Sequence, residues 1–138
     1  MIIAKEIKFE AAHVLSDYNG PCANLHGHSY MGVVSIDAPV NEKTHMVVDF
    51  NNIKRVVDDY DHAIIFSKDS IRNTFEKELY ELVMMHNKKA IVIRDGKCTA
   101  EDISMQMARD ISSYYGCKAR VILRETSSSE VNTGWVEA

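Results

Sequence analysis

The chain is poor in the residues that break a fold into parts. It has only two prolines and six glycines in 138 residues, and no Pro-, Gly- or Ser-rich stretch interrupts it. This favours a single domain over residues 1–138. The longest apolar runs, such as residues 63–66, are far below the roughly 20 residues of a membrane-spanning helix. The first residues also lack the apolar core of a signal peptide, so we expect a cytoplasmic location.

Cysteine and clustered positive charge are equally scarce. Cys22, Cys98 and Cys117 are widely spaced and odd in number, which argues against a disulfide framework and for reduced thiols. The net charge is −4 and no lysine or arginine cluster occurs, so we do not expect a nucleic-acid partner. No glycine-rich dinucleotide fingerprint appears, and no nicotinamide cofactor is expected.

Hydrophobic periodicity predicts an α+β fold. Residues 3–13 and 26–37 alternate as two strands with no crossover helix between them, which favours antiparallel pairing. Helical patterns cover about 50–60, 70–86 and 100–115, with shorter strands at 90–93, 121–125 and 131–136. The predicted order β-β-α-α-β-α-β-β indicates an antiparallel sheet with helices on one face.

Local signals mark where these helices begin and end. Asp49 is the expected N-cap of the first helix, Thr99 with Asp102 resembles a capping box, and Gly116 is the expected C′ residue of the third. The apolar positions expected to face the core are Phe50, Ile53, Val56, Val57 and Tyr60, then Phe75, Leu79, Leu82 and Val83, and finally Ile103, Met107, Ile111 and Tyr114.

Three histidines form a candidate metal site. His26 and His28 are two residues apart on a predicted strand, so both imidazoles project from the same face. His13 ends the preceding strand and can lie beside them. Three neutral imidazoles suit Zn²⁺ and leave a fourth position open, although two nearby histidines alone are as often ordinary half-buried residues. His45 and His86 are expected to be solvated surface residues.

The role of Cys22 stays open from spacing alone. As a fourth ligand it would close the zinc shell and make the site structural. As a free thiol beside a cation it would supply a thiolate base or nucleophile. Cys98 and Cys117 have no partner motif, and small core or surface thiols are the expected roles.

Several acidic residues are weaker candidates. Asp61 precedes His62, and a carboxylate that orients an imidazole is a common acid/base arrangement, although most such pairs are ordinary loop residues. Glu125 ends a predicted strand, where it is either a solvated acid or the anchor for a two-donor edge of a guanine-like ring. Glu101 fits a first-turn residue that complements the helix dipole.

Six short motifs, in this order, resemble the 6-pyruvoyl-tetrahydropterin synthase family. They are Phe9–His13 (F-x-A-A-H), Cys22 followed after three residues by His26-Gly27-His28, Val48-Asp49-Phe50 with Ile53-Lys54, Asp61-His62, Thr99-Ala100-Glu101 and Arg124-Glu125-Thr126. The short gap between the cysteine and H-G-H resembles the bacterial 6-carboxy-tetrahydropterin synthase branch of queuosine biosynthesis. The connection from 67 to 97 departs from the family pattern.

The resemblance implies a role for each of these positions. His13, His26 and His28 would bind Zn²⁺, and Cys22 would be the catalytic thiol with Asp61 and His62 as proton-transfer partners. Glu125 would anchor the pterin ring, with Thr99 and Glu101 nearby. The implied architecture is the tunnelling fold, in which sheets of several subunits close a barrel. The usual assembly is a hexamer of two trimers with active sites between subunits.

The implied reaction converts 7,8-dihydroneopterin triphosphate into 6-carboxy-5,6,7,8-tetrahydropterin, triphosphate and acetaldehyde. One alternative is the same chemistry ending at 6-pyruvoyl-tetrahydropterin after triphosphate elimination. A second is a non-catalytic, zinc-dependent pterin- or purine-binding protein, and a third is a structural zinc module that unfolds on chelation.

Overall fold

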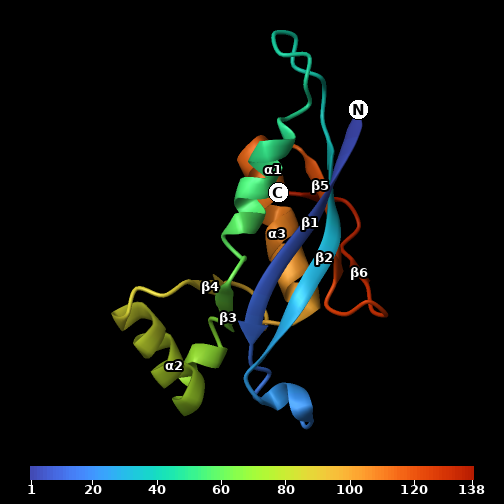
Figure 1. The fold of residues 1–138 in the computed structure, drawn as a ribbon. Coiled ribbons are helices and arrows are strands. Elements are labelled where there is room, and N and C mark those ends of the chain that lie inside the picture. The colour runs from blue at the N-terminus through green and yellow to red at the C-terminus, as the bar shows by residue number, and fades with distance from the viewer.

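One sheet runs through the computed structural model, which describes residues 1–138. Its strands are β1 (Ile2–His13), β2 (His26–Asp37), β3 (Ala63–Ser67), β4 (Ala90–Ile93), β5 (Lys118–Arg124), β6 (Val131–Asn132) and β7 (Val136–Glu137). They are ordered β4-β3-β1-β2-β5-β6, and β7 also pairs with β5. Figure 1 shows β1 and β2 as the long twisted strands at the centre of the molecule.

The antiparallel prediction is confirmed for the central strands and incomplete at one edge. β1 pairs antiparallel with β2 along its whole length, and β2 pairs antiparallel with β5. β3 pairs in parallel with both β1 and β4, and its pairing with β1 involves only Ala11–His13 of β1. The sequence analysis missed β3, because the four-residue apolar run at 63–66 is too short to show a period. The expected strand at 131–136 is two short strands.

Three helices flank the sheet: α1 (Phe50–Asp58), α2 (Thr74–Met85) and α3 (Ala100–Tyr115). Short 3₁₀ turns lie at Pro21–Ala23 and Ser70–Arg72. The predicted caps are confirmed: the Asp49 carboxylate accepts from the Asn51 amide at 2.8 Å, and the Thr99 hydroxyl accepts from the Asp102 amide at 3.3 Å. The reciprocal half of the capping box is absent, because Asp102 accepts from the Lys97 amide instead.

The hydrophobic core lies between the central strands and the helices α1 and α3. Phe9 of β1 stacks on Tyr30 of β2, with ring centroids 4.8 Å apart, and Tyr60 packs against Phe9. The sequence pattern correctly placed Ile53, Val57, Ile103, Met107 and Ile111 in this core. None of the helices is long and apolar enough to cross a bilayer.

The inward-facing prediction for α2 is partly wrong. Phe75 and Leu82 are about half exposed, at 54% and 50%, while Val83 is buried. Tyr80 of α2 packs instead on Phe66 of β3, at 5.4 Å between ring centroids. Because Ile65 belongs to the core under α3, its neighbour Phe66 projects from the opposite face, which α2 therefore covers.

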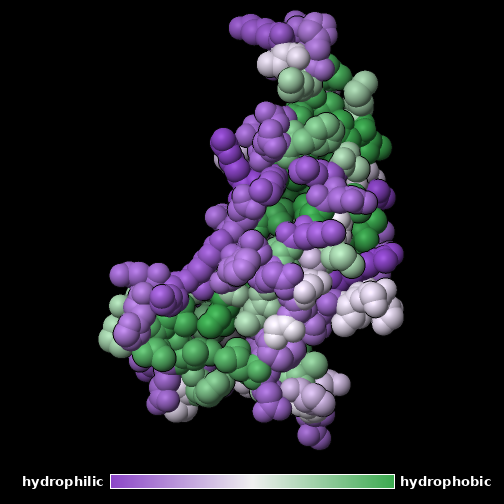
Figure 2. All heavy atoms as spheres, viewed as in Figure 1, coloured by the Kyte–Doolittle hydropathy of each residue, from purple (hydrophilic) through white to green (hydrophobic).

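Other predicted core positions also lie at the surface. Phe50 at the start of α1 is 49% exposed, and Tyr114 near the end of α3 is 77% exposed. Both lie on the outer side of their helices, where nothing in this chain covers them. Figure 2 shows hydrophobic surface over α2, where Phe75, Leu82, Met84 and Met85 are exposed.

Gly32 is the tightest point of the central pairing between β2 and β5. A Cβ at this position would collide with the carbonyl oxygen of Ile122, which is backbone and unable to move aside without breaking the ladder. We expect Gly32→Ala to lower the free energy of unfolding by at least about 2 kcal/mol, measured by urea denaturation. Gly116→Ala is the control. A Cβ at Gly116 meets no atom within 4 Å, but the residue has φ +60. We therefore expect Gly116→Ala to lower the free energy of unfolding by only the conformational cost, about 1 kcal/mol. Equal losses in the two variants would contradict the steric explanation.

Candidate metal and catalytic site

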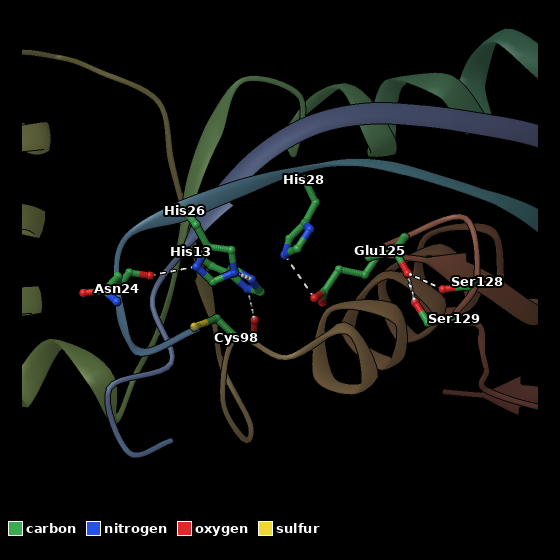
Figure 3. A network of polar contacts seen from close by, with 9 residues as sticks. His13, Asn24, His26, His28, Cys98, Glu125, Ser128 and Ser129 are labelled. Atoms are coloured by element: carbon green, nitrogen blue, oxygen red, sulfur yellow. Dashed lines mark hydrogen bonds and ion pairs between the residues drawn. The ribbon is translucent and has the colours of Figure 1, made fainter. Parts of the chain in front are cut away.

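The three predicted metal ligands converge at one end of the β1–β2 pair. The register pairs His13 with His26 and Ala11 with His28, and paired residues project from the same face. One ligand atom from each of the three histidines lies within 4.8 Å of the other two. His13 is fully buried, whereas His26 and His28 are half-buried. Figure 3 shows the three rings facing a common centre.

Backbone carbonyls hold two of these rings in place. Nδ1 of His13 lies 2.6 Å from the carbonyl oxygen of Cys98, and Nδ1 of His26 lies 2.7 Å from that of Asn24. A carbonyl only accepts, so each Nδ1 carries the proton and each Nε2 presents a lone pair. The two Nε2 atoms are 3.1 Å apart. This outer support is typical of metal-binding histidines.

Burial keeps the innermost ligand in its metal-binding form. The pKa of His13 is lowered, chiefly because burial disfavours the charged imidazolium, although the Cys98 carbonyl opposes the shift. A neutral imidazole is the form that ligates a metal. Without a metal, two lone pairs face each other at 3.1 Å, which is unfavourable unless a cation or a proton lies between them.

His28 adds an unsatisfied nitrogen beside a carboxylate. Its Nε2 lies 3.0 Å from Oε1 of Glu125, yet the angles do not make a hydrogen bond and the nitrogen is buried without a partner. Nitrogens bound tetrahedrally to one Zn²⁺ lie about 3.4 Å apart, so the His13–His26 pair is already close to that separation. An all-imidazole set with an orphaned buried nitrogen fits Zn²⁺.

Cys22 lies outside the ligand set. It sits in the 3₁₀ turn of the loop between β1 and β2, half-buried, and its carbonyl accepts from the Leu15 amide at 2.9 Å. Its sulfur is not among the atoms that converge with the three imidazoles. The other two thiols are core residues, as expected: Cys98 and Cys117 are buried, and burial raises the pKa of both.

Asp61 and His62 form a pair, but the chain does not bring them to the imidazoles. Oδ2 of Asp61 lies 3.0 Å from Nδ1 of His62, and its Oδ1 accepts from the Glu10 amide at 2.8 Å. The hydrogen bond from the backbone N–H of Glu10 lowers the pKa of the Asp61 carboxyl. His62 lines a shallow groove together with Glu10, His28 and Ser29. Glu10 and Ser29 are paired in the register and alternate with the imidazole positions, so their side chains project from the opposite face.

His62 has an unusual backbone conformation. Its φ is +62, in the left-handed region that disfavours side chains, and its amide donates to the Glu10 carbonyl. The ring is 77% exposed. Such strain persists only where the surrounding structure imposes it, and it is frequent at functional sites.

Of the two remaining predicted site residues, Thr99 adjoins the imidazole site and Glu101 makes no polar contact with it. Thr99 follows Cys98 and caps α3, so it adjoins the backbone that holds His13. Glu101 is exposed in the first turn of α3, with no polar contact to the imidazoles. Sequence reasoning missed the carbonyls of Asn24 and Cys98, because any residue supplies a carbonyl.

Tyr30 was also missed as a member of the site. It is 1% exposed, its ring packs edge-on against His13 and His28, and its hydroxyl has no partner. Burial, with help from Glu125, raises its pKa, so the phenol stays protonated. Its alternation with His26 and His28 on β2 was the available signal.

The histidine geometry predicts how metal binding depends on single residues. We expect the purified protein to bind one Zn²⁺ per chain, and His13→Ala or His28→Ala to weaken binding more than about 100-fold, measured by competition with a chromophoric chelator. His45→Ala and His86→Ala are controls, because both residues are exposed and distant in sequence from the site. Equal zinc loss in a control would contradict the assignment.

Chelation should leave the chain folded. The chain buries a hydrophobic core of 20 residues in addition to His13, so far-UV circular dichroism is expected to stay unchanged after zinc removal. Unfolding would instead indicate a structural zinc module.

Comparisons with known proteins identify the family of this chain. The family model described as 6-pyruvoyl tetrahydropterin synthase matches residues 2–137. The chain is 34% identical over 110 residues to the 6-carboxy-5,6,7,8-tetrahydropterin synthase of Haemophilus influenzae, covering 74% of this chain and 75% of that protein. It is 29% identical over 112 residues to the enzyme of the same name from Rickettsia felis, covering 78% and 77%.

Solved structures show the same fold. An uncharacterized protein from Wolinella succinogenes superposes with a TM-score of 0.70 at 23% identity, covering 96% of both chains. The 6-pyruvoyl tetrahydropterin synthase of Caenorhabditis elegans superposes with a TM-score of 0.61 at 20% identity, covering 96% of this chain and 93% of that one. The family match over nearly the whole chain and the 34% identical relative decide the assignment: this chain belongs to the 6-pyruvoyl tetrahydropterin synthase family, a family of lyase enzymes.

Proposed function

We propose that this chain is a zinc-dependent lyase that converts 7,8-dihydroneopterin triphosphate into 6-carboxy-5,6,7,8-tetrahydropterin, with release of triphosphate and acetaldehyde. The observation that carries the proposal is the three-imidazole site with Glu125 at its edge, 3.0 Å from His28. The names of the relatives from Haemophilus and Rickettsia favour the 6-carboxy product. Queuosine biosynthesis in the cytoplasm is the proposed setting, with residues 1–138 acting as one domain.

Glu125 is the proposed anchor of the pterin ring. The side chain is 22% exposed at the end of β5, and a carboxylate there accepts two donors from the ring edge. A ring held by Glu125 places its side chain next to His28 and the open metal position. Thr99 and Glu101, at the start of α3, are proposed to line the same pocket. Bound Zn²⁺ would lower the pKa of the substrate hydroxyls and stabilise developing negative charge.

Proton transfer is assigned to Cys22 and to His62 held by Asp61. The Cys22 thiol stays off the metal in this arrangement and is free to act as a base in its thiolate form. The Asp61 carboxylate orients His62 through Nδ1, which leaves Nε2 to exchange a proton with substrate. The ring is reduced by rearrangement within the substrate, so no nicotinamide is required.

These groups form a complete site only between subunits. Within one chain no polar contact joins Asp61 or His62 to the three imidazoles or to Glu125, and the groove that His62 lines includes Glu10 and Ser29, whose side chains project from the face opposite the imidazoles. Residues 2–10 of β1 also have no strand partner on their second edge, because β3 pairs only with Ala11–His13. A free edge of this length favours pairing with another copy. We therefore propose a homo-oligomer, a hexamer of two trimers, in which one copy supplies the imidazoles and a neighbour supplies Asp61 and His62.

Incubation with substrate tests the reaction directly. Zinc-loaded protein with dihydroneopterin triphosphate should yield the 6-carboxy product and acetaldehyde, both identified by mass spectrometry. Accumulation of 6-pyruvoyl-tetrahydropterin would show that the reaction stops after triphosphate elimination. Binding without turnover would indicate a non-catalytic pterin- or purine-binding protein.

Cys22→Ala separates the catalytic thiol from a metal ligand. Because its sulfur lies outside the converging ligand atoms, the variant should keep its zinc and lose turnover by more than about 100-fold. Cys117→Ala is the matched control, since this buried thiol is remote from the imidazoles in the contacts of the chain. Zinc loss on Cys22→Ala would make the thiol a ligand and overturn its proposed role.

The left-handed conformation of His62 makes a second functional prediction. His62→Gly relieves the backbone strain, so stability should rise by up to about 1 kcal/mol while turnover falls by more than about 100-fold. His45→Gly is the control, because His45 has φ +56 in an exposed loop away from the site. The His45→Gly variant should show the same gain in stability, measured by thermal unfolding, with unchanged turnover. Full activity in His62→Gly would exclude His62 from catalysis.

A further inference from the structure

A second cavity lies behind the metal site, walled off from it by Cys98. It has a volume of about 190 Å³ and opens between the loop after β1, the turn leading into α2, and residues 97–99. The carbonyl of Cys98 faces His13, whereas its thiol donates to the Val14 carbonyl on the cavity side. The two sites are therefore adjacent but separate.

Glu76 lines this cavity with a buried and unsatisfied carboxylate. The residue is 1% exposed, and its Oε1 has no hydrogen-bond partner. A glutamate in the first turn of a helix usually bonds back to the N-cap amide. Here the N-cap is Asn73, and its amide already donates to the Ser70 carbonyl at 3.0 Å. The capping role is taken, so Glu76 faces the cavity without a protein partner.

The neighbouring hydroxyls do not fill this gap. Ser67 and Ser70 bond to one another through side chain and backbone, at 2.8 to 3.0 Å. The Thr99 hydroxyl is engaged with Asp102 at the start of α3. The buried group left without a partner is the Glu76 carboxylate, and the side-chain amide of Asn73, which makes no capping hydrogen bond, lies beside it in the lining.

The charge of the cavity selects a cation. Three carboxylates line it, those of Asp17, Asp69 and Glu76, with the ammonium of Lys97. Asp69 is exposed and pairs with Arg72 at 3.8 Å, so Glu76 carries the charge that no side chain compensates. Lys97 is paired with Asp17 at 3.2 Å, and both side chains are more than half exposed. Burying an unpaired carboxylate costs several kcal/mol, which a bound positive charge removes. A phosphate or carboxylate ligand is excluded by the same charge balance.

The shape of the cavity selects an organic cation over a metal ion. Among histidine, cysteine and carboxylate side chains, only the three imidazoles bring their ligand atoms together, so the carboxylates here do not form a cage. A cavity of about 150 Å³ holds benzene, with six carbon atoms. The volume of about 190 Å³ therefore suits a body of roughly six to eight non-hydrogen atoms.

We propose that this cavity binds a small organic cation, an alkylammonium or alkylguanidinium, whose charged nitrogen pairs with Glu76. Val14, Leu15 and Cys98 supply the apolar wall for its carbon atoms, and Asn73 supplies a further polar contact. None of the residues proposed to move protons lines this cavity, and Thr99 is the one residue that it shares with the proposed pterin pocket.

Charged and neutral probes of equal size test this proposal. The full chain is titrated by calorimetry with pentylammonium and ethylguanidinium, and with their uncharged counterparts pentan-1-ol and ethylurea. We expect one cation bound per chain and at least about tenfold weaker binding of the neutral molecules, because a charged hydrogen bond is lost. Absence of cation binding, or equal binding of the neutral probes, would overturn the proposal.

Glu76→Gln then identifies the group responsible. The substitution keeps the shape and removes the buried charge, so the variant should fold at least as stably and bind the cations at least about tenfold more weakly. Glu78→Gln is the matched control on the exposed side of the same helix and should bind as the native chain does. Unchanged binding in Glu76→Gln would place the cation elsewhere and overturn the assignment.

Two further measurements separate the test of cation binding from the metal site and from oligomerisation. Zinc content and pterin turnover are measured on Glu76→Gln, and both are expected to stay at the native level, so failure of the lyase proposal leaves this test intact. Molar mass by light scattering is measured in parallel. If the native chain binds no cation and Glu76→Gln dissociates the oligomer, the cavity holds a side chain of another copy, and the small-molecule proposal fails.

Discussion

The register of β1 against β2 is the constraint on which the site depends. It pairs His13 with His26 and Ala11 with His28, so that three imidazoles share one face of the sheet. A slip of one residue would send both β2 histidines to the opposite face, because the side-chain period is two. Phe9 stacked on Tyr30, two residue pairs further along and on the same face, holds this register through the hydrophobic core. Core packing and metal-ligand geometry are thus determined by the same backbone pairing.

The same alternation divides the polar groups at this end of the sheet between two faces. Ligand imidazoles project toward the core side, where burial keeps His13 neutral, whereas Glu10, Ser29 and His62 lie on the open side. One sheet cannot present both faces to one small substrate. The division supports the proposal of an active site between two copies, as does the edge of β1 at residues 2–10 that no strand of this chain covers.

Sequence reasoning succeeded where a local period or cap determined the outcome. The alternation in β1 and β2 located the three imidazoles, and Asp49 and Thr99 marked two helix starts, because these signals act over a few residues. The predicted burial of Phe75 and Leu82 was wrong, since an apolar stripe shows that a helix face is hydrophobic but not which surface of the protein covers it. Sequence reasoning also failed for the carbonyls that hold His13 and His26, which no side-chain pattern reveals. β3 was too short to recognise.

The segment from 67 to 97 is one of the parts in which the sequence departs from the family pattern, and it forms part of the second cavity. This segment contributes the turn and first residues of α2, while the rest of the wall comes from the loop after β1 and from Cys98, which holds His13. A buried carboxylate without a partner reduces stability, and a glutamine or leucine at position 76 would avoid that cost. A buried charge placed at such a cost is most simply explained by the proposed cation, which would offset it. Because Cys98 lies between this cavity and His13, such a ligand would bind beside the imidazoles without displacing them.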